Sequence, residues 1–364
     1  MYWLYSWTRI LLFFARYFAS RTRLVRPPFV SGIIEEVAEA IGPIVGVPKH
    51  FALIGAEHCP KDGPVIFCAN HTKLDDPLLV YHAARMAGGR LSRIMMRDDY
   101  FVGPLWENPI VAAPKLFACM GAHMIDRDRV TLAQMKPFLN VLDEDGSFII
   151  FPGRTRTRSG VFIEYRENFT EPGGVSFFIR QTQKKRSDVR VAAVPIVRTF
   201  NPASKRTASI LGPPLYLDHA ADRDAMREFD ANVVVAMSRL VEINAAQLVS
   251  ALLYLRVLHG RTSSVTIDRL ADDISQVSPR LKGLHADPAI SADAIGEVGA
   301  VVRFLAREGM VSLDGQSIRP NAERILLPPP LDTTYRRENP VKYLANQILH
   351  FGDVVEGITE RALQ

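Results

Sequence analysis

A histidine and an aspartate five positions apart, His71 and Asp76, are the first side chains in the sequence that could do chemistry together. They follow the apolar, β-branched run 65–69, which is typical of a buried strand. On one continuous helix, five residues turn through about 500°, which leaves the two side chains about 140° apart. The pair can therefore meet only if a turn separates them.

The dipeptide Asp76-Pro77 supplies such a turn, because Asp is favoured as a helix N-cap and Pro at the first helical position. A helix that begins there returns Asp76 to the strand end, where its carboxylate could accept a hydrogen bond from one imidazole nitrogen of His71. The other nitrogen would then be free to act as a general base on a substrate hydroxyl. The alternative is that Asp76 only caps a helix and His71 is an ordinary loop histidine.

Two further strand ends carry arginines. One short strand is followed by Arg127, and a second, buried strand opens into a loop with three alternate arginines, Arg154, Arg156 and Arg158. The planar guanidinium group binds phosphate through two hydrogen bonds, and ligands of α/β proteins bind at strand ends. Each segment alone is typical of a solvated basic loop. Together they predict a phosphate pocket beside a general base.

The elements that must position these side chains alternate between short strands and helices from about residue 64 to 217, which predicts an α/β core. The predicted strands are 64–69, 93–96, 123–125, 147–151, 189–197 and 209–211. The predicted helical or mixed segments between them are 76–86, 100–119, 132–144 and 174–181.

After Asp218 the sequence changes to long helical patterns, and its only strand signal is 311–318, where Asp314-Gly315 predicts a hairpin turn. The long helical patterns are 221–258, 266–274 and 292–308. A helix followed by a hairpin can resemble a winged helix, which binds nucleic acid. Nucleic-acid binding needs a dense basic patch, and the local basic residues are only Arg303, Arg307 and Arg319. We therefore expect no nucleic-acid partner.

Residues 1–29 predict an amphipathic helix with an aromatic and aliphatic face opposite arginines. The arginines interrupt every stretch that could reach about 20 apolar residues, and they follow the apolar core instead of preceding it. A membrane-spanning helix and a cleaved signal peptide are therefore both disfavoured. Such a helix is typical of a bilayer interface, so we expect it to bind an anionic membrane surface. The alternative is a helix packed on the protein body.

The overall composition excludes several classes of protein. The 364 residues are 48% hydrophobic and 23% charged, as in ordinary globular proteins. The three cysteines, Cys59, Cys68 and Cys119, form no CxxC pair, so neither a disulfide framework nor a metal site is expected. There is no HExxH, Walker A or GxSxG motif. The formal net charge of +5 suits anionic lipid or phosphate ligands.

Four blocks of the sequence, taken in order, resemble the glycerolipid acyltransferase superfamily. The segment from His71 to Asp76 resembles its histidine-four residues-aspartate motif, and 121–127 resembles its second block. The segments 151–160 and 194–197 are similar to its phosphate-binding third block and its fourth block. Downstream, 244–253 and 343–351 resemble segments of glycerol-3-phosphate and dihydroxyacetone-phosphate acyltransferases. Asn70-His71 before Asp75-Asp76-Pro77 also resembles tafazzin-type transacylases.

The resemblance implies an α/β fold with a mixed central sheet and flanking helices over residues 30–217. An amphipathic helix, 1–29, precedes it and a mainly helical region, 218–364, follows it. It also implies acyl transfer from acyl-CoA or acyl carrier protein to glycerol-3-phosphate in phospholipid biosynthesis, with His71 as general base and Asp76 orienting it. No further cofactor and no metal are implied. The expected substrate-binding residues are Arg127, Thr155, Arg156, Arg154, Arg158 and Lys73.

One departure from the family pattern is Gly153-Arg154, which stands where the third block usually has Glu-Gly. The departure leaves the acceptor open: a lysophospholipid acyltransferase or transacylase is one alternative, and a catalytically weak membrane protein that binds lipid phosphate is another. A third alternative is that residues 218–364 bind nucleic acid or another partner and the α/β part only carries them. We expect a peripheral location on the cytoplasmic face of a membrane.

Overall fold

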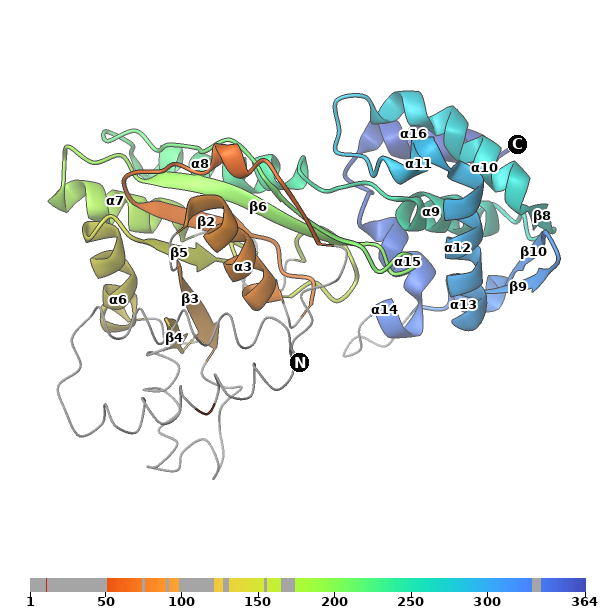
Figure 1. Cartoon of the computed structure of the whole chain (residues 1–364), viewed down its shortest axis with the longest axis horizontal. Helices are drawn as coiled ribbons and strands as arrows, with labels where there is room; N and C mark the ends of the chain where they lie inside the picture. The colour runs from red at the N-terminus through yellow and green to blue at the C-terminus, as the bar shows by residue number, and fades with distance from the viewer. Residues whose placement is uncertain are drawn as a thin grey trace.

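The structure, a computed structural model, contains a seven-stranded sheet with helices on both faces, and a second group of helices beside the sheet (Figure 1). No helix in the described part of the chain is both long and apolar enough to span a membrane. The predicted N-terminal helix lies outside the described residues, except for Leu11, which is helical and exposed. The structure describes residues 11, 51–73, 76–89, 92–97, 121–126, 131–153, 156–164, 174–328 and 335–364.

The sheet is mixed and has the strand order β1-β7-β6-β2-β5-β3-β4. All neighbouring strands are parallel except β6 and β7, which pair antiparallel through a short connection. This arrangement confirms the expected α/β fold with a mixed central sheet. The strands are β1 Phe51–Ile54, β2 Val65–Ala69, β3 Ser92–Arg97, β4 Ala122–Ile125, β5 Ser147–Ile150, β6 Ala192–Phe200 and β7 Thr207–Leu211.

Strand β2 lies in the middle of the sheet and is buried along its whole length. Its alternate side chains enter two different hydrophobic clusters: Ile66 and Cys68 pack with helices α6 (Leu132–Asp143), α7 (Val175–Lys185) and α8 (Arg223–Ser238), whereas Phe67 packs with α3 (Asp76–Gly88). A strand covered on both faces must be apolar at every position, which is why β2 reads as an unbroken apolar run.

The predicted strands of the sheet are all present, with ends that differ by up to a few residues, but β1 was not predicted. The predicted helical pattern 221–258 is divided into α8 and α9 (Ala245–Leu258). Asn244 causes the division, because its side chain accepts hydrogen bonds from the backbone N–H groups of Ala246 and Gln247 and so caps a new helix. The predicted segment 100–119 lies outside the described residues.

The predicted hairpin is confirmed as β9 (Val311–Asp314) and β10 (Ser317–Pro320), which form a small antiparallel sheet with β8 (Val265–Thr266). Its turn lies one residue later than predicted, because Asp314 pairs with Ser317 and leaves Gly315 and Gln316 in the loop. Gly315 adopts a φ of 56°, which glycine reaches without a steric cost.

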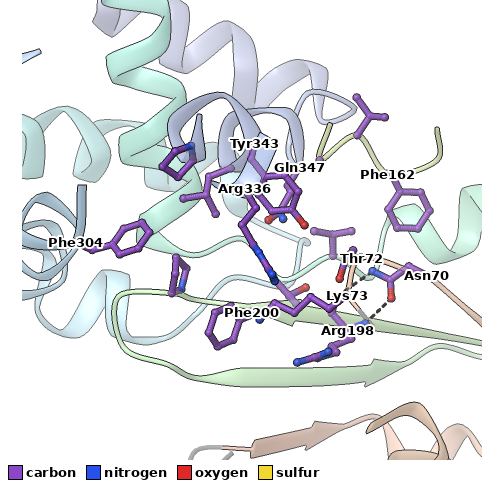
Figure 2. Close-up of a pocket in the computed structure, with 17 residues that line it drawn as sticks. Asn70, Thr72, Lys73, Phe162, Arg198, Phe200, Phe304, Arg336, Tyr343 and Gln347 are labelled. Atoms are coloured by element: carbon purple, nitrogen blue, oxygen red, sulfur yellow. Dashed lines mark hydrogen bonds between the residues drawn. The ribbon is translucent and has the colours of Figure 1, made fainter. Parts of the chain in front are cut away.

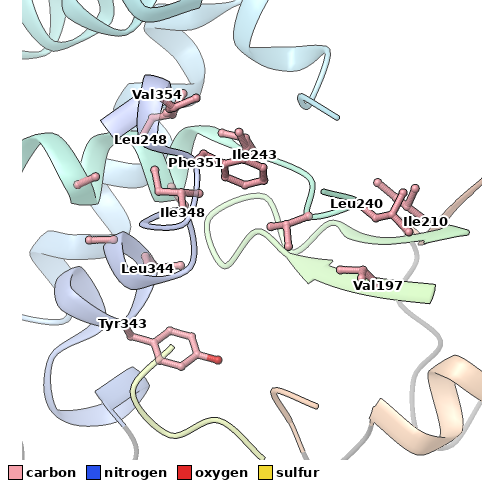
Figure 3. Packing of buried hydrophobic residues seen from close by; sticks show 14 of the residues in the cluster. Val197, Ile210, Leu240, Ile243, Leu248, Tyr343, Leu344, Ile348, Phe351 and Val354 are labelled. Carbon is pink, nitrogen blue, oxygen red and sulfur yellow. The ribbon is translucent and has the colours of Figure 1, made fainter. Parts of the chain in front are cut away.

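Helix α9 is the buried centre of the helical group and packs against α10, α12, α15 and α16. The group shares one hydrophobic core with the sheet: Val197 and Ile210 of the sheet belong to the same cluster as Ile243, Leu248 and Phe351 (Figure 3). Helix α8, which follows residue 218, packs on β6. The elements after α9 are β8 Val265–Thr266, α10 Ile267–Val277, α11 Ala289–Ala292, α12 Ala294–Arg307, β9 Val311–Asp314, β10 Ser317–Pro320, α13 Ala322–Leu326, α14 Tyr335–Glu338, α15 Pro340–Asn346 and α16 Gly352–Ala362.

Candidate active site

His71 and Asp76 meet at the carboxyl end of β2. The chain turns after Ala69 and begins α3 at Asp76, and the His71 Nδ1 atom lies 3.1 Å from Asp76 Oδ2. The Asp76 side chain is fully buried and the His71 side chain is 22% exposed. The predicted turn is therefore present, and it brings the two side chains into hydrogen-bond contact.

The carboxylate of Asp76 does not cap α3, the helix that begins at this residue. Its Oδ2 atom accepts hydrogen bonds from the backbone N–H groups of Thr72 and Lys73, each at 2.5 Å. Its Oδ1 atom accepts a hydrogen bond of 2.5 Å from the guanidinium of Arg198, a side chain on β6 that is only 3% exposed. All these partners lie outside α3, so the carboxylate orients the loop and His71 rather than capping the helix.

This environment keeps Asp76 ionised. Burial alone would raise the pKa of its carboxyl, but the hydrogen bond from His71, the positive charge of Arg198 and the backbone hydrogen bond from Lys73 outweigh burial and lower the pKa. An ionised carboxylate can only accept, so Nδ1 of His71 carries the proton that joins the pair. The Nε2 atom then has a lone pair, and no described residue bonds to it.

Arg198 is itself positioned by Asn70, the first residue after β2. The Asn70 side chain donates to the backbone carbonyl of Arg198 at 3.0 Å and accepts from its backbone N–H at 2.8 Å. The paired strands place Ala69 opposite Ile196, so this amide extends the ladder beyond the strand end. The guanidinium of Arg198 is thereby held beside Asp76.

The loop of the predicted phosphate block lies beside His71. The backbone N–H of Thr157 donates to the carbonyl of His71 at 2.9 Å, and Arg156 and Arg158 flank this contact in the sequence. Both arginines are partly buried. The other three residues predicted to bind phosphate lie outside the described residues: Arg127, Arg154 and Thr155.

A cleft opens next to this dyad, between the sheet and the helices α14 and α15 (Figure 2). The empty space between its walls is about 640 Å³ when the part that is open to solvent is included. Lys73, predicted to bind substrate, lines the cleft with its Nζ atom 3.2 Å from the ring centre of Phe200. Arg198 and Arg336 add two further cationic side chains, and Phe162 contributes to a largely apolar wall.

Sequence reasoning missed Arg198 and Arg336. A signal for Arg198 was present, because this arginine directly follows the predicted apolar strand 189–197, and a buried arginine is rarely found without a charged partner. Arg336 lies in a short helix with no local motif, so only the folded chain reveals its place. Among the described residues, no three His, Cys, Asp or Glu side chains are grouped as a metal site would require.

Comparison with known proteins finds one family model that matches part of the chain, and a similar solved structure. Residues 50–197 match the family model described as Acyltransferase. No curated protein matches the sequence. Among solved structures, the chain is similar to the crystal structure of the 1-acyl-sn-glycerophosphate (LPA) acyltransferase PlsC from Thermotoga maritima. The two share 16% sequence identity with a TM-score of 0.38, over 64% of this chain and 93% of that chain.

Proposed function

We propose that this protein, which carries an acyltransferase-family segment over residues 50–197, moves a fatty acyl group from acyl-CoA or acyl carrier protein to glycerol-3-phosphate. The observation that carries the proposal is the contact of 3.1 Å between His71 and the buried carboxylate of Asp76. A histidine held in one tautomer by an ionised carboxylate is suited to general-base catalysis. The reaction belongs to phospholipid biosynthesis.

The mechanism follows from the free nitrogen of His71. Its Nε2 atom takes the proton of the acceptor hydroxyl as the hydroxyl oxygen attacks the thioester carbonyl carbon. Asp76 stabilises the imidazolium that forms. When the tetrahedral intermediate collapses, the carbon–sulfur bond breaks, and the leaving thiolate takes the proton from the imidazolium. No covalent acyl-enzyme is required.

Phosphate binding would decide which hydroxyl faces the thioester. Arg156 belongs to the loop that contacts His71, and Arg127 was predicted to end a neighbouring strand, so both would hold the acceptor phosphate. Fixing the phosphate converts an encounter in solution into a reaction within one complex, which lowers the entropic part of the barrier.

A second candidate is transfer to a lysophospholipid that carries a phosphate, such as lysophosphatidate. The apolar side chains of Phe162, Phe304 and Leu344 in the cleft favour it, because glycerol-3-phosphate has no hydrocarbon to place there. The same lining would also suit the acyl chain of the donor. The two candidates therefore differ in which substrate supplies the chain that fills the cleft.

An acceptor panel tests both candidates. We would follow thiol release from palmitoyl-CoA, and separately from palmitoyl-acyl carrier protein, with glycerol-3-phosphate, dihydroxyacetone phosphate, lysophosphatidate or no acceptor. The proposal predicts acceptor-dependent release that is fastest with glycerol-3-phosphate. Faster release with lysophosphatidate would assign the second candidate. Absence of acceptor-dependent release with either donor would contradict acyl transfer.

A further inference from the structure

We propose that helices α14 and α15 complete the substrate site, and that Arg336 on α14 binds the phosphate group of a substrate there. The inference rests on the proposed function, and it names a residue that lies well beyond residue 197, where the match to the Acyltransferase family model ends.

The first support is a chain of hydrogen bonds between the catalytic loop and these helices. The loop that donates to the His71 carbonyl through Thr157 accepts a hydrogen bond from the backbone N–H of Tyr335 at the Arg158 carbonyl, at 2.9 Å. One residue further, the Asn346 side chain donates to the Ser159 carbonyl at 2.9 Å. The two helices are therefore attached to the same loop that contacts the proposed base.

A glycine permits this close approach. Gly160 has a φ of 93°, and a Cβ atom there would overlap the backbone carbonyl of Tyr343 on α15. The loop and α15 thus touch backbone to backbone, without intervening side chains. The arrangement places the wall made by the helices directly over the cleft that adjoins His71.

The second support is the charge of the cleft. Its described lining residues include three cationic side chains, those of Lys73, Arg198 and Arg336, and no carboxylate. Arg198 is already paired with Asp76. Within the described residues Arg336 has no ion-pair partner, and in Figure 2 its side chain extends from α14 toward Lys73 and Phe200. A guanidinium that faces other cations in a cleft is suited to bind an anion between them.

The phenol of Tyr343 lies close enough to both Arg336 and Asp76 for their charges to affect its pKa. Burial is the main cause that raises the pKa of its phenol; the charges of Arg336 and Arg156 lower it, and the charge of Asp76 raises it. One phenol therefore lies within range of the proposed catalytic carboxylate, the arginine of the phosphate loop and the arginine of α14. A phosphate held by Arg336 would lie in this common region.

The third support is the apolar remainder of the cleft. Beyond its cationic side chains, the lining consists of Val161, Phe162, Val241, Phe304 and Leu344, among others. A site with cations beside a hydrocarbon surface fits a substrate complex that contains a phosphate monoester and a fatty acyl chain. The phosphate could belong to the acceptor or to the nucleotide part of acyl-CoA, and the experiment separates these sources.

The adjacent residue Arg337 provides a matched control, because it has the same side chain, is also exposed on α14 and does not line the cleft. We would measure KM for glycerol-3-phosphate and for palmitoyl-CoA in the wild type, Arg336→Gln, Arg336→Lys and Arg337→Gln. We expect Arg336→Gln to raise one of these KM values at least about tenfold with kcat little changed, since a charge-assisted hydrogen bond is lost. Arg336→Lys should recover part of the loss, and Arg337→Gln should match the wild type.

The substrate whose KM rises identifies the source of the phosphate. A rise for glycerol-3-phosphate alone assigns the acceptor. A rise for palmitoyl-CoA that is absent with a palmitoyl-pantetheine thioester, which lacks the nucleotide phosphates, assigns the donor. Equal KM values for Arg336→Gln and Arg337→Gln with every substrate would overturn the inference while leaving acyl transfer intact.

Binding without turnover separates this inference from the proposed reaction. Titration calorimetry of inorganic phosphate and glycerol-3-phosphate into the full-length His71→Ala protein, with and without Arg336→Gln, needs no catalysis. Binding weakened at least about tenfold by Arg336→Gln, but not by Arg337→Gln, would support an anion site even if no acceptor were acylated. Binding that both arginine variants leave unchanged would overturn it.

Discussion

The carboxylate of Asp76 joins two parts of the molecule that lie 122 residues apart in the sequence. One oxygen orients His71 and the loop before α3, and the other holds the guanidinium of Arg198. Because the carboxylate is fully buried, its negative charge is tolerated only while these partners balance it. Arg198 therefore acts on the proposed base through Asp76, as a positioning residue.

Replacement of Arg198 by methionine should expose this dependence. The change leaves a buried carboxylate without its strongest charged partner, so we expect a loss of about 2–4 kcal/mol in the free energy of unfolding and a lower kcat. Urea unfolding and turnover measure the two effects. Arg227→Met is the control, because that arginine is 55% exposed in a surface ion pair and should cost under about 0.5 kcal/mol. Equal costs for the two variants would contradict the assigned role of Arg198.

The local part of this site could be predicted and the distant part could not. The His71–Asp76 pair follows from a strand, a turn and a helix start within a few residues, all of which local patterns indicate. Arg198 meets Asp76 only because β2 and β6 are neighbours, with Ala69 opposite Ile196. Strand order depends on the packing of the whole sheet, so no local pattern contains it.

At the scale of elements, the contact between the 156–160 loop and α15 depends on glycine. Gly160→Ala should separate loop and helix, because its Cβ would overlap the Tyr343 carbonyl, whereas Gly283→Ala meets nothing within 4 Å at a similar φ of 83°. We expect about 1–2 kcal/mol of destabilisation for Gly283→Ala from backbone strain alone. Gly160→Ala should cost more than about 3 kcal/mol and should reduce kcat/KM. Chemical denaturation that gives equal costs would argue against the close contact.

His123 on strand β4 provides a second test at this scale. Burial and the positive charge of the neighbouring Arg93 lower the pKa of its imidazole to about 4. The Arg93 guanidinium donates to His123 Nε2 at 2.8 Å, a bond that needs the neutral imidazole. Between about pH 4 and the ordinary pKa of about 6.5, the imidazole of His123 is mostly protonated in the unfolded protein and mostly neutral in the folded protein. This contribution to stability is therefore complete above about pH 6.5 and is lost as the pH falls toward 4.

We expect His123→Gln, which keeps an acceptor for Arg93, to remove that part of the pH dependence. The imidazole is partly exposed, so solvent screening reduces the effect, and the wild type should lose about 1 kcal/mol more than the variant between pH 7 and pH 5. Urea titrations at the two pH values measure the difference. A wild type and variant with parallel pH profiles would show that His123 titrates normally in the folded protein.

The elements themselves were predicted well where their signals are local. Apolar β-branched runs indicated β2 and β5 because both are covered on two faces, whereas β1 lies at the sheet edge, has a partly exposed pattern and was missed. The break between α8 and α9 was missed because apolar periodicity continues across it. The capping box of Asn244 and Gln247 was the available signal.

At the scale of the whole molecule, the helical region after residue 218 packs against the sheet and forms part of the cleft. Val197 and Ile210 share a hydrophobic core with its helices, and α14 and α15 form a wall of the cleft beside His71 (Figures 2 and 3). The sequence indicated that these residues are helical. It could not indicate what they contact, because packing between segments more than 100 residues apart leaves no periodic pattern. The division into regions 1–29, 30–217 and 218–364 stays a prediction.

Membrane association also belongs to this scale, and it stays a prediction because residues 1–29 lie outside the described residues apart from Leu11. Deletion of residues 1–19 should weaken co-sedimentation with anionic liposomes, because it removes the aromatic face and two arginines, Arg9 and Arg16. Turnover of a water-soluble acyl thioester should persist. Unchanged sedimentation with anionic vesicles would refute a peripheral location that depends on this segment.

The most direct test of the account is the turnover of His71→Ala. With palmitoyl-CoA and the best acceptor of the panel, we expect kcat to fall by about 10²- to 10⁴-fold or more, because the general base is removed. The thermal unfolding midpoint should stay close to that of the wild type. His259→Ala, which changes an exposed histidine at the end of α9, should retain kcat within about twofold. Acceptor-dependent turnover of His71→Ala at the wild-type rate would contradict the proposed mechanism.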